Sequence, residues 1–383
     1  MIKTRSFKLK LSHHDFKLVQ NHSIESAKCW NDIIKIAKDY YDINKKWISK
    51  FDIQPLIKGQ YELHSETVQG LTDIFNANRQ TIAQLRRNGD KKAKYPYKEK
   101  HFFMIPFKTH AIKQTETNLR LTLHSKCYLN ISISNLPKIR TTQLVWNNGY
   151  YLFYTFDEPV IDTYGTKTCG IDLGEVHSIA MTTEEGNSLI ISNRLGRSIK
   201  RYRNKKLGSF SEAIHRCTKY SRKWRKLVNS KNEMKIKTKN QLRNLYHQTT
   251  RKAIDFAVSN NIGEIVCGNP KGVGKNTKKN KTNSSKNRQK LSQAEFGTLK
   301  QYLKYKAESK GIIFSLVNES YTSQTCPACS TRKKPTGRNY SCECGFKAHR
   351  DIVGAFNILR KKYQCELVDF VMSYRHPIKV SYY

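Results

Sequence analysis

Hydrophobic and polar positions in the first part of the chain follow a strand-like and then a helix-like period. Residues 1–11 alternate loosely, which predicts a strand. From about His13, and again from about Ser65 to Leu85, apolar residues recur at spacings of three and four, so both stretches are predicted helices. Between them lies an irregular piece that contains Pro55 and Gly59.

The pattern changes at residue 93, because prolines at 96 and 106 interrupt helices. Strands are predicted at 119–123, 128–133, 143–146 and 150–156, and Asn148-Gly149 is a strong hairpin signal between the last two. We therefore expect a small β-barrel-like domain built from residues 1–12 and 93–160. Residues 13–92 would form a helical insertion within it.

The second half alternates strands with helices. Three antiparallel strands are predicted at 168–174, 177–182 and 188–191, followed by a basic helical region over about 195–260. A strand at 262–268, a helix from Leu291 to about Lys310, a strand at 312–317 and a last helix after His349 complete the order. This order is that of a ribonuclease-H-like sheet, so the expected class is a multidomain α+β and α/β protein. The tail 366–383 gives no clear pattern.

The charge of the chain points to a polyanionic partner. Among 383 residues, Lys and Arg number 70 against 30 acids, which gives a formal net charge of +40. Nucleic acid is the first candidate, and 21 tyrosines would suit base stacking. A membrane surface is second, because the basic residues run along the whole chain instead of clustering locally. We expect no transmembrane helix and no signal peptide, and the largely scattered cysteines indicate a reduced, cytoplasmic setting.

Particular basic and aromatic residues are candidates for contacts with RNA or DNA. The competing interpretation of the patch that ends the first helical region is a solvated helix end. The basic loop after residue 268 is expected to be disordered until a partner binds. The candidates are Arg86, Arg87, Lys91, Lys92, Tyr95, Arg201, Arg203, Arg222, Arg225, Lys278 and Lys279.

Two cysteine pairs predict a metal site. Cys326 and Cys329 precede Cys342 and Cys344, with twelve residues between the pairs. Thiolates at this spacing favour tetrahedral ligation of one structural Zn²⁺ on a knuckle over residues 321–348. The second pair is closer in sequence than usual, which leaves His349 as a conceivable substitute ligand.

Three acids predict a second site. Asp172 lies within a strand, Glu295 lies on the apolar stripe of a predicted helix, and Asp351 opens the last helix. Each has an ordinary alternative: an exposed strand acid, a first-turn acid or an N-cap. On a ribonuclease-H-like sheet the three would converge and bind two Mg²⁺ or Mn²⁺ ions about 4 Å apart for phosphodiester hydrolysis.

The motifs GIDLG, IVCGNPKGVG, LSQAEFG, SQTCPAC and SCECGFKAHRDIVGAFNIL resemble TnpB, the transposon-encoded RNA-guided DNA endonucleases related to type V CRISPR effectors. The resemblance implies a RuvC nuclease domain over 165–320 and 349–365, a wedge-type barrel, and a recognition function for the helical insertion. It implies a guide RNA from the transposon end, a double-stranded DNA target with a short adjacent motif, and association with a prokaryotic nucleoid. A transposase encoded in the same element is a further suggested partner.

One departure from the TnpB pattern concerns the second catalytic acid, which most of the family places where this chain has Gly268. A subgroup that resembles this chain carries a Glu in an SQ-x-E-[FY]-G helix, which matches Glu295, and Glu264 is a weaker substitute. Without a substitute the chain would resemble nuclease-inactive RNA-guided repressors. An unguided zinc-knuckle nucleic-acid-binding protein is the third hypothesis.

Overall fold

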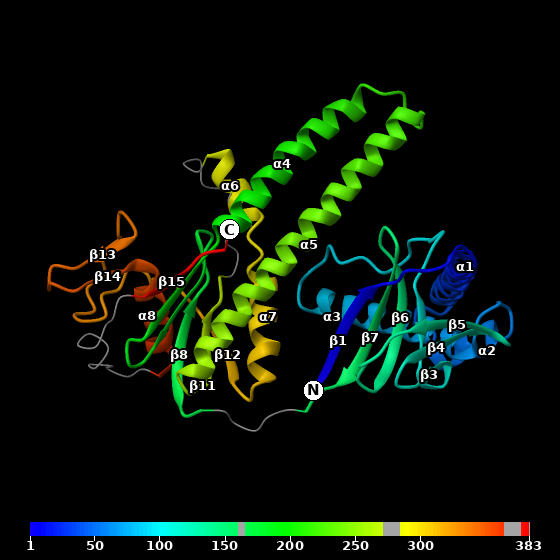
Figure 1. Cartoon of the computed structure of the whole chain (residues 1–383), viewed down its shortest axis with the longest axis horizontal. Helices are drawn as coiled ribbons and strands as arrows, with labels where there is room; N and C mark the ends of the chain where they lie inside the picture. The colour runs from blue at the N-terminus through cyan, green and yellow to red at the C-terminus, as the bar shows by residue number, and fades with distance from the viewer. Residues whose placement is uncertain (160–164, 271–283, 364–376, 383) are drawn as a thin grey trace. The chain divides into compact units, whose positions relative to one another are not determined.

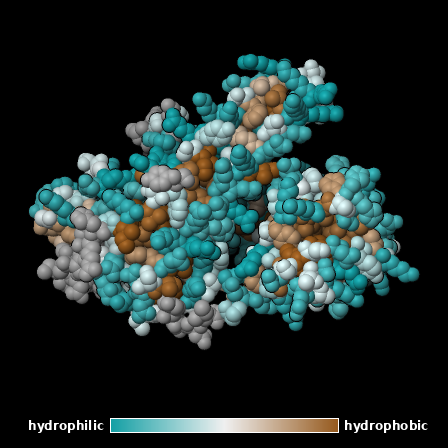
Figure 2. Space-filling model, in the orientation of Figure 1, coloured by the Kyte–Doolittle hydropathy of each residue, from teal (hydrophilic) through white to brown (hydrophobic). Residues whose placement is uncertain are grey.

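The chain forms two compact units, Met1–Glu158 and Pro159–Tyr383. The structure is a computed structural model, and it describes residues 1–159, 165–270, 284–363 and 377–382. Figure 1 traces the elements of each unit, and Figure 2 shows that hydrophilic residues predominate on the visible face. In the described ranges, no helix is both long enough and apolar enough to cross a membrane.

The first unit contains two antiparallel sheets rather than one closed barrel. Four strands pair in the order β1-β7-β6-β2, and three pair in the order β3-β4-β5. The barrel of the prediction is therefore not confirmed, since no pairing joins the two sheets within the described residues. The strands are β1 (Ile2–Lys8), β2 (Ile105–Phe107), β3 (Ile112–Gln114), β4 (Asn118–His124), β5 (Cys127–Ser132), β6 (Ile139–Trp146) and β7 (Tyr150–Asp157), with a 3-10 turn η1 (Thr109–Ala111).

The predicted hairpin joins β6 and β7. Asn148 and Gly149 both have positive φ angles, 53° and 127°, as a tight turn between twisted strands requires. Asn tolerates this conformation and Gly adopts it without strain, so the local sequence determines the register of these two strands.

Three helices lie between β1 and β2 in the sequence: α1 (His13–Asn44), α2 (Lys50–Ile57) and α3 (Ser65–Arg87). The first and third are those that the apolar spacing predicts. The second lies in the piece expected to be irregular, where Ser49 accepts a hydrogen bond from the Asp52 N–H and caps its N-terminus. Buried residues from all three helices, including Trp30, Ile53 and Phe75, form their common core.

The second unit is built on a six-stranded sheet with the order β12-β11-β8-β9-β10-β15. β8, β9 and β10 are antiparallel neighbours, and β11 and β12 extend the sheet in parallel with β8. This confirms the predicted ribonuclease-H-like order and adds a short parallel strand from the tail. The strands are β8 (Lys167–Asp172), β9 (His177–Thr183), β10 (Ser188–Ser192), β11 (Ile262–Gly268), β12 (Ile313–Val317) and β15 (Ile378–Val380).

Helices cover both faces of this sheet. Alternate residues of β9 point to opposite faces, so Ile179 and Met181 pack with α5 and α7, whereas Ala180 packs with α8. Within this unit, the pair α4 and α5 continues well past the edge of the sheet (Figure 1). The helices are α4 (Arg194–His215), α5 (Arg222–Ser259), α6 (Ser285–Ser292), α7 (Phe296–Glu308) and α8 (Arg350–Tyr363).

The predicted helix from Leu291 to Lys310 is interrupted. α6 ends at Ser292, and α7 begins at Phe296, so Glu295 is the N-cap residue of α7 instead of a residue on the stripe of a continuous helix. A two-stranded hairpin, β13 (Asn339–Ser341) and β14 (Lys347–His349), precedes α8.

Candidate functional site

Asp172 lies at the end of β8, near the middle of the sheet, and faces α8. A Cβ atom added at Gly354 would lie 2.7 Å from Oδ2 of Asp172, and one at Gly170 would lie 2.0 Å from the carbonyl oxygen of Ala355. Both glycines are therefore needed for α8 to pack against β8 at this distance. Because Asp351 is on the first turn of α8, the same packing brings these two acids to one edge of the sheet.

The environment of Asp172 disfavours its ionised form. The residue keeps some exposed surface, but dense packing around its carboxylate is the main cause that raises its pKa to about 7. The negative charges of Glu319 and Asp351 act in the same direction. The positive charges of Arg350 and Arg338 oppose them. Asp172 therefore lies among acids whose charges the nearby arginines compensate only in part.

Asp351 is buried and held by partners from two other elements. Arg338 donates through Nη1 to both carboxylate oxygens, at 3.2 and 3.0 Å, and His177 Nδ1 lies 2.7 Å from Oδ2. Burial favours the protonated acid, but the hydrogen bond with His177 and the charge of Arg338 outweigh it, so the pKa of Asp351 is lowered. His349 Nδ1 accepts the Asp351 N–H at 3.3 Å. Asp351 is thus ionised and oriented.

Glu319, which the sequence analysis did not single out, is the third acid of this cluster. It follows β12, and its Oε2 lies 2.9 Å from the position that a Cβ atom on Gly268 would take. β11 and β12 are parallel, and Gly268 pairs with Val317, so the end of one strand lies beside the end of the other. The Glu319 carboxylate therefore enters the space next to Gly268, where the TnpB resemblance places the second catalytic acid.

The surroundings of Glu319 leave its carboxylate poorly compensated. Burial raises its pKa, and the charge of Lys300 opposes this effect. Its Oε2 is buried and has no hydrogen-bond partner within the described residues. A pocket lined by Asn269, residues 316–318 and Ser320 adjoins it. An unpaired buried oxygen whose charge acts on the Asp172 carboxylate suits a hard divalent cation, because such ions take oxygen ligands. We name Asp172, Asp351 and Glu319 the acid cluster.

Glu295 and Glu264 have different partners. Glu295 hydrogen-bonds the Tyr246 hydroxyl, and its charge acts on Lys200. Glu264 accepts from Ser315 at 2.7 Å and contacts Lys362 and Tyr363. These contacts lower the pKa of Glu264 despite its partial burial. The two carboxylates that raise the pKa of Asp172 are those of Glu319 and Asp351, so the structure brings together two of the three predicted acids and adds Glu319.

The four predicted cysteine ligands converge. The Sγ atoms of Cys326 and Cys344 are 3.6 Å apart, those of Cys329 and Cys342 are 3.5 Å apart, and all four lie within 4.8 Å of one another. Tetrahedral ligation with Zn–S bonds of about 2.3 Å places sulfur atoms about 3.8 Å apart, so the arrangement fits zinc. His349 belongs instead to a group with His177 and Asp351.

The candidate nucleic-acid residues fall on separate elements. Arg86 and Arg87 end α3, with Arg86 stacked over the Tyr95 ring at 4.8 Å. Arg201 and Arg203 lie on α4, and Arg222 and Arg225 lie on the first turn of α5. Lys91 and Lys92 are exposed after α3. Lys278, Lys279 and most of the loop predicted to be disordered lie outside the described residues.

Two family models match the second half of the chain and its border with the first. Residues 152–274 match the OrfB_IS605 model, described as "Probable transposase". Residues 296–358, which span α7, the cysteine cluster and the start of α8, match the Cas12f1-like TNB domain.

A curated relative and a solved structure agree with these matches. A TnpB-like protein of Methanocaldococcus jannaschii is 38% identical over 80 residues, which is 20% of this chain and 29% of that protein. The chain thus spans under a third of that relative. A cryo-EM structure of a Cas12f1–sgRNA–target DNA complex matches 92% of this chain and 84% of that one, with a TM-score of 0.67 and 13% identity, which supports a shared fold. Together, the family models and the curated relative show that the second unit is similar in sequence to TnpB-like proteins.

Proposed function

We propose that this chain is an RNA-guided DNA endonuclease that hydrolyses phosphodiester bonds at the acid cluster. The observation that carries the proposal is the juxtaposition of Asp172, Asp351 and Glu319 at one edge of a ribonuclease-H-like sheet, with the charges of Glu319 and Asp351 both raising the pKa of Asp172. Three acids kept together in spite of their repulsion favour a metal-dependent reaction over a purely structural role.

The proposed partners are a guide RNA and a double-stranded DNA target. The structural relative is a complex with an sgRNA and target DNA, and the formal net charge of +40 would allow one chain to neutralise both. In such a division of labour, base pairing reads the target sequence, and the protein reads a short adjacent motif.

The chain's own residues would prepare the reacting phosphate. Divalent ions such as Mg²⁺, when bound by the three carboxylates, would activate water and stabilise the leaving oxygen. Arg338 pairs with Asp351 through Nη1 alone, so its other guanidinium nitrogens can donate to a phosphate oxygen. His177 fixes the orientation of the Asp351 carboxylate.

Glu319 replaces Glu295 as our preferred third acid. Glu319 lies beside Gly268 and acts on Asp172, whereas the contacts of Glu295 are with Tyr246 and Lys200. The assignment of Glu295 as catalytic, and its link to a subgroup with a relocated acid, stays a prediction from the sequence. The two assignments make opposite predictions for single substitutions.

The test compares cleavage by four proteins, each purified with its transposon-end RNA and given Mg²⁺ and a plasmid library that carries the matched target. We expect wild type, Glu295→Gln and Glu264→Gln to cleave, and Glu319→Gln to bind the target without cutting it. Loss of cleavage in Glu295→Gln alone would restore the original assignment. Guided binding without cleavage by the wild type would favour the repressor. Binding that is independent of RNA would leave an unguided zinc-knuckle protein.

A further inference from the structure

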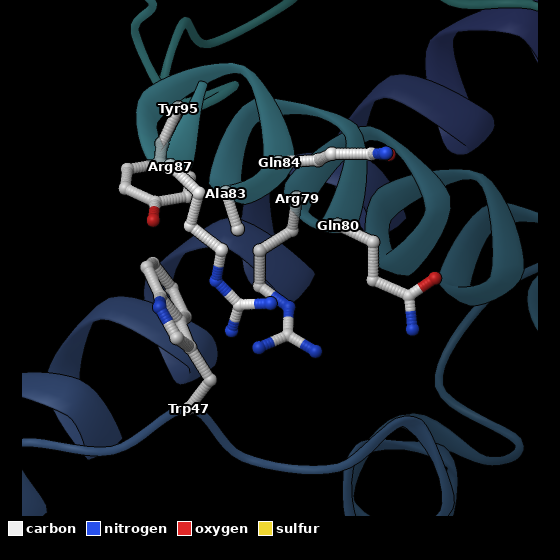
Figure 3. Close-up of a pocket in the computed structure, with 7 residues that line it drawn as sticks. All are labelled: Trp47, Arg79, Gln80, Ala83, Gln84, Arg87 and Tyr95. Carbon is white, nitrogen blue, oxygen red and sulfur yellow. The ribbon is translucent and has the colours of Figure 1, made fainter. Parts of the chain in front are cut away.

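A pocket in the first unit lies along one face of α3, outside the acid cluster and the cysteine cluster. Residues 79, 80, 83, 84 and 87 line it from the helix, at spacings that place them on one side. Trp47, from the segment between α1 and α2, and Tyr95, from the segment after α3, complete the lining. Figure 3 shows the guanidinium groups of Arg79 and Arg87 side by side next to the Trp47 ring. We name this the basic pocket.

The aromatic part of the basic pocket is a cluster of rings. Trp47 lies 5.0 Å from Tyr95 and 4.7 Å from Tyr41, measured between ring centroids, and Tyr97 lies 6.1 Å away in a stacked arrangement. Trp47 and Tyr95 are only half-buried, and Tyr97 is 40% exposed. The guanidinium of Arg79 lies over the Trp47 ring at 5.5 Å, and that of Arg86 lies over the Tyr95 ring at 4.8 Å. The remaining exposed area of the cluster is held at a fixed place, which suits the stacking of another ring.

The charged part of the basic pocket has no acidic counterpart. Arg79 donates to the side chain of Asn76 at 2.8 Å, and its Nε is buried without a hydrogen-bond partner in the chain as described. Neither Arg79 nor Arg87 has an acid within ion-pair distance among the described residues, and none of the residues that line the pocket is acidic. Two guanidinium groups held next to each other without an anion suit a phosphate.

We propose that the basic pocket binds an unstacked nucleotide, with its base on the Trp47–Tyr95 cluster and its phosphate at Arg79 and Arg87. The side-chain amides of Gln80 and Gln84, which also line the pocket, can both donate to and accept from the edge of that base. The inference rests on the proposed function, because it assumes that the chain binds nucleic acid, and it assigns a ligand to a site remote from the chemistry.

An unpaired strand is a better ligand for this pocket than a duplex. In a duplex the faces of the bases are stacked on one another, so an aromatic side chain can reach them only after unstacking. A single strand presents base faces directly, and every base can stack, so sequence preference would come only from Gln80 and Gln84. The unpaired strand can belong to the guide RNA or to a separated strand of the target.

The test uses the full chain and 15-nucleotide probes that carry one 5-bromouracil, as RNA and as DNA, with a 15-base-pair duplex as a third probe. Irradiation should cross-link a single-stranded probe to a peptide that contains Trp47 or Tyr95. Trp47→Leu should weaken single-strand binding about five- to 150-fold, as loss of base stacking does. Arg87→Gln should reduce the slope of log K against log salt by about 0.7, the value for one phosphate in a single strand.

Matched controls separate the pocket from general effects. Trp146→Leu removes a more exposed tryptophan of the same unit, and Arg140→Gln removes an exposed arginine that is paired with Asp157. Both should bind the single strands as wild type does, and all variants should keep the far-UV circular-dichroism spectrum of the wild type. Cross-linking by the RNA probe alone assigns the pocket to the guide, and by the DNA probe alone to the target.

Two results would overturn the inference, and they differ in what else they affect. If wild type binds the probes but Trp47→Leu and Arg87→Gln bind them equally well, the pocket has no such role, and the proposed endonuclease function stands. If wild type binds none of the three probes, nor its transposon-end RNA, the proposed function and the pocket fail together.

Discussion

The acid cluster of the second unit and the basic pocket of the first unit are opposite in charge, and the fold compensates them to different degrees. In the acid cluster, Asp351 is paired with Arg338, whereas Glu319 keeps an unpaired buried oxygen. In the basic pocket, neither Arg79 nor Arg87 has an acidic partner among the described residues. Under the two proposals, each region is completed by a ligand of opposite charge: cations in the acid cluster and phosphate in the basic pocket.

The largest effect should follow from removal of one charge of the acid cluster. Asp172→Asn should lower the cleavage rate at least about a thousandfold, because metal-assisted charge stabilisation is worth several kcal/mol. In buffer without Mg²⁺ the same variant should be more stable than wild type, by on the order of 1–3 kcal/mol, because the raised pKa of Asp172 reflects an unfavourable charge. Cleavage assays and thermal melts measure the two effects. A variant that loses stability would contradict the view that this charge is uncompensated.

The cysteine cluster provides a third case, in which a bound Zn²⁺ would compensate half of the negative charge of four thiolates. A zinc chelator, or Cys342→Ser, should lower the free energy of unfolding by several kcal/mol, since zinc binding and folding of the knuckle are coupled. The matched control is Cys217→Ser, which changes a cysteine outside the cluster. Zinc content should be one ion per chain in the wild type and in the control. Unchanged unfolding after complete zinc loss would show that the thiols do not need a metal.

His247 lies among positive charges and is neutral near pH 7, because its pKa is lowered. Burial lowers its pKa to about 4, and the charges of Lys306, Arg243 and Arg251 add to this effect. The unfolded chain, with a pKa near 6.5, takes up the proton first, so stability should be lost as the pH falls from about 6.5 towards 4. Since the residue is partly exposed, we expect about 1–2 kcal/mol between these limits.

The pH effect of His247 can be isolated with a variant. In denaturant titrations at pH 7 and pH 5, His247→Gln should lose less stability than wild type on acidification. His215→Gln, a substitution of an exposed histidine at the end of α4, should behave as wild type. Equal acid sensitivity of all three proteins would assign the effect to other groups.

The smallest effect should come from the basic pocket. Arg79→Gln should lower the free energy of unfolding by about 0.5–1 kcal/mol, because it loses the contact over the Trp47 ring and the hydrogen bond to Asn76 but no ion pair within the described residues. Arg338→Gln should cost about 1–3 kcal/mol, because it leaves the buried Asp351 with less compensation. Thermal melts of both variants test the comparison directly. A large loss in Arg79→Gln would indicate a structural role for that arginine.

Elements of the fold can be predicted from the sequence where a strong local signal exists. The apolar spacing predicts α1 and α3, and Asn148-Gly149 predicts the hairpin of β6 and β7. Pairing between distant strands has no such local signal, which is why the first unit was expected to be a barrel and forms two sheets. α2 was missed because Pro55 lies inside it, beyond the first turn where proline is usually tolerated.

The residues of the candidate site also differ in whether the local sequence identifies them. Asp172, Asp351 and the four cysteines are identified by motifs that lie close to them in sequence. Glu319 follows an exposed edge strand, and nothing in its immediate sequence distinguishes it from a solvated acid. Two facts together would have pointed to Glu319: the expected acid is missing at Gly268, and β12 is the parallel neighbour of β11, so their ends lie side by side.

Because Glu319 lies next to Gly268, a carboxylate can occupy the same place in the fold while coming from a different column of a sequence alignment. A survey that scores each homologue column by column would find glycine at the expected place and count this chain among inactive relatives. Under the proposed assignment, that survey would undercount active nucleases. Homologues with a small residue at the end of β11 should therefore be inspected at the residue that follows the adjacent strand before they are classified.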